Sequence, residues 1–316
     1  MSLDTSLLAD VADALGIERP AIVEKDYYAV QLLKLLATIK PIEFDLVFAG
    51  GTSLAKAHQN TYRMSEDIDI KLVPKASETG GMSRGALRVA SKATLKMIEE
   101  KLEASEQFVI ESGGIKKRNE YRYAEFLIAY PQTQVTIPAL RPHLKLDVTQ
   151  SSLMQPPINT ALRSLYAEAL NQSAEVSDFP SVDIQSTASE KLVALLRRTA
   201  YADRDSSRKD DKTLIRHVYD LHLIFKSGCD LKPIESLIQI VMKTDAEHFG
   251  RQHVEFLTDP RAEMLHGLAC LQREPIHKER YEAFIGPLVY HESPVQWDEA
   301  LQTLTDLTHQ VLWVEA

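Results

Sequence analysis

Two aspartates and a pair of glycines lie close together in AGGTSLAKAHQNTYRMSEDIDIK, residues 49–71. Asp67 and Asp69 belong to the alternating stretch EDIDIKLV, which predicts a half-buried strand. Side chains two residues apart on a strand point to the same face, so the two carboxylates project together. Buried carboxylates are costly without a positive partner, and a divalent metal ion is the simplest candidate. Oxygen ligands favour Mg²⁺ or Mn²⁺.

A third carboxylate is available in the later strand-like stretch HLKLDVT, residues 143–149. Lys145 and Asp147 share one face of this stretch. If it lies beside the strand of Asp67 and Asp69, the three acids converge, and we expect all three aspartates to be metal ligands. Three acids around two metal ions suit in-line phosphoryl or nucleotidyl transfer.

Gly50 and Gly51 follow a short apolar run, DLVFA, which predicts a strand that ends in a turn. Glycine lets the backbone approach a phosphate closely. The helix predicted over residues 51–60 would offer its N-terminal amides to an anion, and Thr52 and Ser53 add hydroxyl donors. The stretch is not a Walker A loop, because G-x-x-x-x-G-K-[ST] is absent. These residues therefore predict a triphosphate site beside the metal.

Each feature also has an ordinary structural explanation. A Gly-Gly pair is most often only a turn, and Asp-x-Asp is most often a solvated strand face. Their conjunction at this spacing, with a third acid on a later strand, favours the triphosphate-plus-metal interpretation.

The elements that must position these residues fall into two parts. Strand and helix patterns are mixed as far as about residue 155, whereas no strand pattern is convincing after Pro156 and Pro157. We therefore predict an α+β domain with a small mixed sheet over residues 1–155 and an α-helical domain over residues 156–316. The helices predicted in the second part cover residues 160–170, 186–200, 211–226, 233–243, 260–272, 277–284 and 296–312.

Composition excludes some classes of function. The net charge of −9 argues against a dedicated binder of duplex DNA, which needs a basic face. No apolar run is long enough to span a membrane, and the first residues lack the basic and apolar regions of a secretory signal. Cys229 and Cys270 form neither a disulfide framework nor a C-x-x-C pair. We expect a cytoplasmic protein in which both cysteines are ordinary small side chains.

Four stretches, in order, carry a resemblance to a known family. They are VEKDY at residues 23–27, FAGGTSLAKAH…RMSEDIDI, EKLVA at residues 190–194 with two arginines shortly after it, and RHVYDLHLIF. The second fits the hG[GS]…Dh[DE]h signature of the DNA polymerase β-like nucleotidyltransferase superfamily. The ordered set resembles the AbiEii/AbiGii-type toxin nucleotidyltransferases, which include the MenT toxins. It extends from residue 23 to residue 225, about two thirds of the chain.

The resemblance implies a nucleotidyltransferase domain whose nucleotide site is completed by the helical domain. It implies that Asp67 and Asp69 ligate metal and that Gly51 and Ser53 hold phosphates. The residues expected to bind the nucleotide are Gly50, Gly51, Thr52, Ser53, Lys56 and Lys191, and those expected to act in catalysis are Asp69, Asp147, Lys191 and Asp220.

Several of these assignments have alternatives. Lys191 could be an exposed helix lysine that pairs with a neighbouring acid, and Asp220 could be a structural acid that holds Arg216 or Lys191. His217 stands where many relatives have an aspartate, which leaves its role open. The resemblance suggests that the charged residues 24–26 brace the site, with Asp26 pairing with a basic residue.

The implied activity is metal-dependent transfer of a nucleotide from an NTP, with release of pyrophosphate. The resemblance implies the toxin of a toxin–antitoxin or phage-defence pair, with the tRNA 3′ end as acceptor and an antitoxin encoded nearby. Transfer to a protein or small molecule, or a nucleotide-binding regulatory module without turnover, are the alternatives. RRTAYADRDSSRKDDK, residues 197–212, and IKKRNEYRY, residues 115–123, could contact RNA, although a solvated loop or a hairpin tip would look the same.

Overall fold

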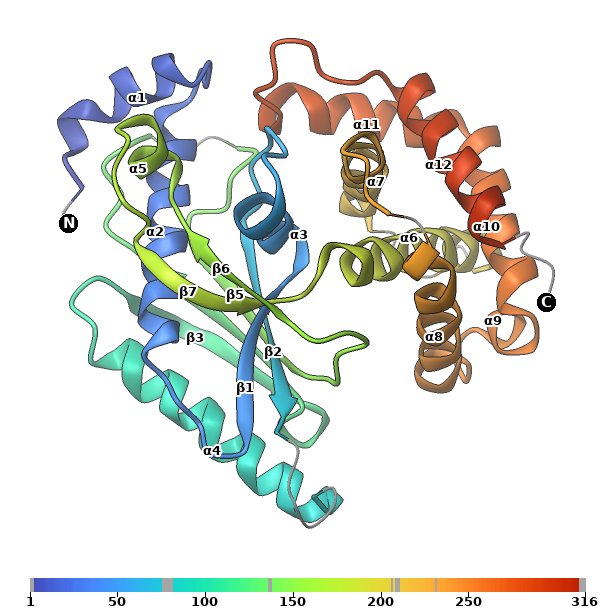
Figure 1. The fold of residues 1–316 in the computed structure, drawn as a ribbon, viewed down its shortest axis with the longest axis horizontal. Coiled ribbons are helices and arrows are strands. Elements are labelled where there is room, and N and C mark those ends of the chain that lie inside the picture. The colour runs from blue at the N-terminus through green and yellow to red at the C-terminus, as the bar shows by residue number, and fades with distance from the viewer. Residues whose placement is uncertain are drawn as a thin grey trace. The chain divides into compact units, whose positions relative to one another are not determined.

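A seven-stranded sheet with the order β3-β4-β5-β2-β1-β7-β6 organises the first part of the chain in the computed structural model (Figure 1). The structure describes residues 3–75, 82–135, 138–205, 207, 211–230 and 232–312. The chain divides into two compact units, Met1–Val182 and Asp183–Ala316. The first combines the sheet with helices and the second is helical, which confirms the predicted α+β class.

The sheet mixes parallel and antiparallel pairs. Its strands are β1 (Phe44–Ala49), β2 (Asp67–Pro74), β3 (Val109–Arg118), β4 (Tyr123–Ala129), β5 (Leu144–Gln150), β6 (Ile158–Leu162) and β7 (Val176–Ser181). β2 is antiparallel to β1 and parallel to β5, and β4 is antiparallel to both β3 and β5. β7 is parallel to β1 and antiparallel to β6.

Alternation along the strands decides which side chains enter the core. Ile68, Ile70 and Leu72 of β2 are buried, whereas Asp67 and Asp69, which alternate with them, are half-buried. β4 and β5 show the same alternation. The aspartates therefore lie on a face that the apolar side chains of their strand do not use.

Helices and short turns complete the first unit. They are α1 (Leu8–Ala14), α2 (Pro20–Ala37), α3 (Gly50–Ser53), α4 (Arg84–Glu103) and α5 (Leu165–Ala169), with single 3₁₀ turns at Thr5–Leu7 and Asn119–Tyr121. α4 packs against β3, and α2 packs against β7 and α5. The long helices α2 and α4 run beside the sheet in Figure 1.

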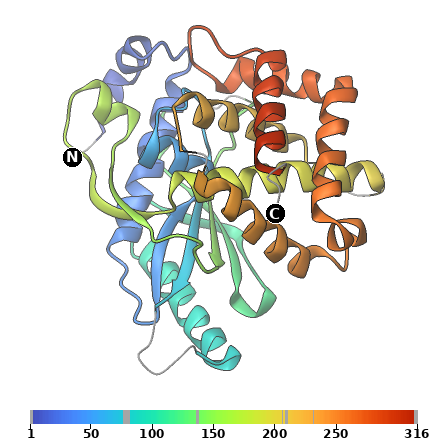
Figure 2. The ribbon, with the colours of Figure 1, turned by 45° about the vertical axis from the view of Figure 1, so that its right-hand side comes forward.

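The described residues of the second unit form helices around α6. The helices are α6 (Ile184–Arg204), α7 (Arg216–Lys226), α8 (Lys232–Phe249), α9 (Val254–Thr258), α10 (Pro260–Arg273), α11 (Pro275–Leu288) and α12 (Trp297–Leu312), with a 3₁₀ turn at Lys212–Ile215. α6, drawn in yellow in Figure 2, packs against α7, α8 and α10. None of the helices formed by the described residues combines the length and apolar character that crossing a bilayer requires.

The prediction that no strand follows Pro157 is wrong. β6 occupies Ile158–Leu162, where the sequence pattern predicts the start of a helix over residues 160–170, and α5 begins only at Leu165. β7 then pairs with both β1 and β6, so the first unit extends beyond residue 155 to Val182. These strands are short and contain Asn, Ser, Asp and Pro, which have low strand propensity, so pairing with the existing sheet determines them.

Candidate active site

Strand register sets a row of acids across one face of the sheet. Asp69 on β2 lies opposite Asp147 on β5, and Asp147 lies opposite Glu125 on β4. Adjacent strands are about 4.8 Å apart, so these carboxylates are neighbours. Asp67 lies two residues before Asp69 and opposite Lys145. The three aspartates thus share one face, as the pairing predicted from the sequence requires.

Basic side chains lie against these acids. The Arg141 guanidinium donates to Asp67 Oδ1, and Lys145 Nζ donates to Asp147 Oδ2 at 2.5 Å. Lys145 Nζ also lies 3.6 Å from Glu125 Oε2. Burial opposes the charge on Lys145, but the hydrogen bond to Asp147 and the surrounding carboxylates raise its pKa overall. The sequence argument offers only a metal as the positive partner, whereas the chain itself supplies two cations.

Tyr123 also fixes the orientation of Asp147. The Tyr123 hydroxyl donates to Asp147 Oδ1 at 2.9 Å, opposite the oxygen that Lys145 contacts. Burial, and then the charge of Asp147, raises the pKa of Tyr123, so the phenol keeps its proton and remains a donor. Lys116 lies 2.5 Å from Glu125, and this hydrogen bond lowers the pKa of the Glu125 carboxyl. Alternation in YRYAEFLIAY places Tyr123 and Glu125 together, but sequence reasoning could not find their pairing with β5.

A buried ion pair holds the backbone of Arg141. Lys25 Nζ on α2 lies 2.6 Å from Glu66 Oε1, and the two side chains are 1% and 3% exposed. Lys25 Nζ also donates to the Arg141 carbonyl at 2.7 Å, and the Arg141 N–H donates to Glu66 Oε1 at 2.7 Å. Burial lowers the pKa of Lys25 despite its partner Glu66. Because both backbone groups of Arg141 are held, its guanidinium is directed to Asp67.

The neighbours of Lys25 brace the same region. Asp26 Oδ1 lies 2.5 Å from Lys56 Nζ, and Asp26 Oδ2 accepts from the Leu165 N–H at 2.6 Å. The prediction that Asp26 pairs with a basic residue is therefore confirmed. Glu24 accepts from the Thr133 N–H at 2.8 Å. Lys56, expected to bind nucleotide, is in this structure the partner of Asp26.

Gly50 lies so close to Asp69 that a side chain would not fit. Its φ is +77°, and a Cβ placed there would lie 1.9 Å from Asp69 Oδ2. α3 begins at Gly50 and continues into a π-helical turn over Leu54–His58, close to the helix predicted over residues 51–60. Such turns are frequent at functional sites. Glycine at position 50 therefore allows both the left-handed backbone conformation and the close approach to the Asp69 carboxylate.

The two hydroxyls after the glycines have different surroundings. Thr52 Oγ1 donates to the Asp67 carbonyl and lies 3.0 Å from Ser65 Oγ, so it ties α3 to the start of β2. Ser53 Oγ is buried and has no hydrogen-bond partner among the residues that the structure describes. An unsatisfied buried hydroxyl is costly, so Ser53 has a donor available for a ligand.

The donor set on this face fits a divalent cation. Asp67, Asp69 and Asp147 supply the carboxylate oxygens that Mg²⁺ and Mn²⁺ prefer. Because Gly50 has no Cβ, no side-chain atom of this residue occupies the space beside Asp69 Oδ2. An additional cation would complement a face on which carboxylates lie in a row.

In the second unit, Lys191 and Asp220 form a buried ion pair. Lys191 Nζ on α6 donates to Asp220 Oδ2 on α7 at 2.9 Å, with side chains 7% and 0% exposed. Nζ also lies 3.4 Å from His217 Nδ1. The alternative in which Asp220 holds Lys191 is therefore observed, and His217 lies beside the same ammonium group.

Several basic residues of the two stretches considered for RNA form ion pairs. Residues 115–118 belong to β3, where Lys116 pairs with Glu125 and Lys117 Nζ lies 2.6 Å from Glu99. Arg197 pairs with Asp245 at 2.9 Å, and Arg198 pairs with Asp211 at 2.6 Å. Residues 206 and 208–210 of the second stretch lie outside the described part of the chain.

Known proteins share the family and the fold of this chain. Residues 34–303 match the family described as the nucleotidyl transferase AbiEii toxin of Type IV toxin–antitoxin systems. No curated protein matches the chain. MenT4, a nucleotidyltransferase toxin from Mycobacterium tuberculosis H37Rv, has a similar structure, with a TM-score of 0.63 and 18% identity over 100% of this chain and 91% of that one. At this identity the likeness shows a shared fold. The family match covers most of the chain, which therefore belongs to the AbiEii family of toxin nucleotidyltransferases.

Proposed function

We propose that this nucleotidyltransferase uses Mg²⁺ or Mn²⁺ held by Asp67, Asp69 and Asp147 to transfer a nucleotide from an NTP to an acceptor. The observation that carries the proposal is the pairing of Asp69 with Asp147, beside a Gly50 backbone too close for any side chain. Arg141 and Lys145 offset part of the charge of these neighbouring carboxylates, and a divalent cation would offset more of it. A divalent ion and the phosphates of an NTP together satisfy the carboxylates, the glycine turn and the Ser53 hydroxyl.

Some residues of this face would bind the metal and the phosphates, and others would orient the metal ligands. Bound metal would neutralise charge that develops on the transferred phosphoryl group and on the departing pyrophosphate. The Gly51 amide and the Ser53 hydroxyl donate to phosphate oxygens. Arg141 and Lys145 hold Asp67 and Asp147 in place, and their positive charge favours the approach of a polyanionic substrate. Tyr123 and Lys145 each donate to one oxygen of Asp147 and fix the orientation of its carboxylate.

Lys191 is proposed to contact the triphosphate, as its place in the family's third motif suggests. A lysine near the leaving group helps to neutralise pyrophosphate. Asp220 limits the rotation of the Lys191 side chain, since the two form a 2.9 Å ion pair. Lys191→Ala is expected to weaken triphosphate binding, and an unchanged nucleotide dissociation constant would remove this assignment.

The acceptor that we propose is the 3′ end of tRNA, where an added nucleotide blocks translation. Support comes from membership of a toxin family, since a toxin must modify something that the cell needs. We infer that the protein is the toxin of a toxin–antitoxin or phage-defence pair, with an antitoxin encoded nearby.

The test is transfer of label from each α-³²P NTP, with Mg²⁺, onto total tRNA. Asp69→Ala removes a proposed metal ligand, and Asp178→Ala, an exposed acid on β7, is the matched control. We expect labelled tRNA with the wild-type protein and Asp178→Ala, and none with Asp69→Ala. Label that appears only on protein or a small molecule would contradict the acceptor. Nucleotide binding without transfer to any acceptor would contradict the enzymatic role.

A further inference from the structure

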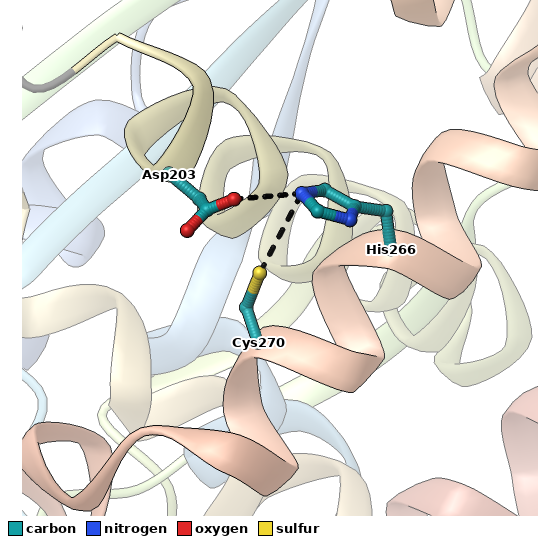
Figure 3. Close-up of side chains that lie close together, drawn as sticks. All are labelled: Asp203, His266 and Cys270. Carbon is teal, nitrogen blue, oxygen red and sulfur yellow. Dashed lines mark hydrogen bonds and ion pairs between the residues drawn. The ribbon is translucent and has the colours of Figure 1, made fainter.

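Three side chains of the helical unit form a cluster outside the residues proposed for nucleotidyl transfer. Asp203 lies near the end of α6, and His266 and Cys270 lie on α10 (Figure 3). His266 Nε2 lies 2.8 Å from Asp203 Oδ2 and 3.7 Å from Cys270 Sγ. A carboxylate oxygen, an imidazole nitrogen and a thiol sulfur thus lie within 4.8 Å of one another.

Helix packing places these three groups without help from a ligand. The two α10 residues are four apart, so they lie one above the other on the same face of the helix. α10 comes so close to α6 that a Cβ at Gly267 would lie 2.0 Å from the Leu196 carbonyl oxygen. Arg204 on α6 and the buried Glu263 on α10 pair at 3.0 Å. The close backbone contact and the Arg204–Glu263 ion pair therefore hold α6 and α10, the helices that carry the cluster, against each other.

The donor set differs from that of the acidic sheet face. Nitrogen, sulfur and oxygen ligands together are the set that Zn²⁺ accepts in proteins, often with three protein ligands and one water. Mg²⁺ takes oxygen ligands almost exclusively. One positive group already adjoins the cluster, because Arg273 Nη2 lies 3.3 Å from Asp203 Oδ1 and 3.8 Å from Cys270 Sγ.

A cavity reaches this cluster from within the helical unit. Its volume is about 660 Å³, and both Asp203 and Cys270 line it. The Asp203 side chain is 29% exposed and His266 is 27% exposed, so an ion and a water molecule have access.

We propose that Asp203, His266 and Cys270 bind one Zn²⁺ ion, with water as the fourth ligand. The ion joins α6 to α10 and stabilises the helical unit. It takes no part in nucleotidyl transfer, and its ligands share no residue with the acidic sheet face.

Co²⁺ is the probe for this site, because thiolate ligation of Co²⁺ gives a charge-transfer absorption that carboxylate ligation does not. The full-length protein would be titrated with Co²⁺ in excess Mg²⁺, which occupies the oxygen ligands of the first unit. The chain contains a matched control, since Cys229 is its only other cysteine. Wild-type protein and Cys229→Ser are expected to develop the band at one Co²⁺ per chain, and Zn²⁺ is expected to abolish it.

Variants of the proposed ligands decide the outcome. Cys270→Ser should lose the charge-transfer band, and His266→Asn should bind Co²⁺ at least about tenfold more weakly, because even outer-shell partners contribute that much. His266 is partly exposed, so this variant keeps the test available if the buried Cys270→Ser does not fold. Zn²⁺ should raise the melting temperature of the wild-type protein but not of either ligand variant. A wild-type protein without the band, or a band lost in Cys229→Ser and kept in Cys270→Ser, would overturn the proposal.

Discussion

The acidic sheet face of the first unit and the Lys191–Asp220 pair of the second use charge in opposite ways. On the sheet, carboxylates of like charge adjoin one another, with Arg141 and Lys145 beside them, and the Asp67 and Asp147 side chains are 35% and 16% exposed. In the helical unit, opposite charges meet at 2.9 Å with almost no exposure. A row of like charges favours an incoming cation, whereas a buried opposite pair satisfies itself. Substitutions on the sheet face should therefore lower activity with little change in stability. Substitutions in the helical pair should change both.

Asp69→Ala is expected to have the largest effect on activity. Transfer should fall by about 10³-fold or more, at the upper end for removal of one preorganised electrostatic group. The free energy of unfolding should change by less than about 1 kcal/mol, because Asp69 lies on a half-buried face and not in the core. Label transfer and urea unfolding measure the two quantities. Loss of soluble, folded protein would show that Asp69 has a structural role.

Asp220→Ala should instead lower stability. Removal of one partner leaves the Lys191 charge buried and unpaired, which typically costs about 3–5 kcal/mol. The control is Asp298→Ala. Asp298 lies 3.4 Å from its partner Lys278, and the side chains of Asp298 and Lys278 are 82% and 46% exposed. Exposed pairs contribute about 0–1 kcal/mol. Equal urea midpoints for the two variants would contradict the assignment of a structural ion pair.

Gly50→Ala should combine a moderate loss of stability with a loss of activity. An alanine with positive φ costs roughly 1–2 kcal/mol, and its Cβ would displace the Asp69 carboxylate. A misplacement of about 1 Å can reduce turnover about 100-fold. Gly16→Ala is the matched control, because Gly16 has a φ of +66° and no atom within 4 Å of an added Cβ. The strain should be shared by both variants, and equal transfer rates would argue against the close approach to Asp69.

Arg141→Gln should have the smallest effect of the four. The change removes the donor that orients Asp67, and partners of metal ligands typically contribute about 10–100-fold to affinity or activity. We expect a loss near the lower limit, seen in kcat and in the KM for NTP. Arg88→Gln, at an exposed position on α4, is the control. Identical kinetics in the two variants would remove Arg141 from the site.

The acids of the sheet face could be predicted because their signal is local. Alternation with a period of two residues places Asp67 and Asp69 together, and the same rule applies to Asp147 once its strand is recognised. Gly50 also follows from a local pattern, an apolar strand that ends in a Gly-Gly turn. The observed register adds that Asp69 and Asp147 lie directly opposite each other.

The partners of these acids could not be predicted, because they depend on contacts distant in sequence. Arg141 is 74 residues from Asp67, and Lys25 is 41 residues from Glu66. β6 and β7 are only five and six residues long and include Asn, Asp and Pro, so pairing within the sheet determines them. The Asp203–His266–Cys270 cluster likewise requires the packing of α10 on α6 at Gly267.

The most direct test of the proposed metal site on the sheet face uses electron paramagnetic resonance to measure Mn²⁺ binding in the presence of a non-hydrolysable NTP analogue. This measurement needs no acceptor. The wild-type protein and Asp178→Ala should bind Mn²⁺ together with the nucleotide, and Asp69→Ala should bind it at least about tenfold more weakly. If Asp69→Ala binds Mn²⁺ as tightly as the wild-type protein, the row of aspartates on β2 and β5 is not the metal centre.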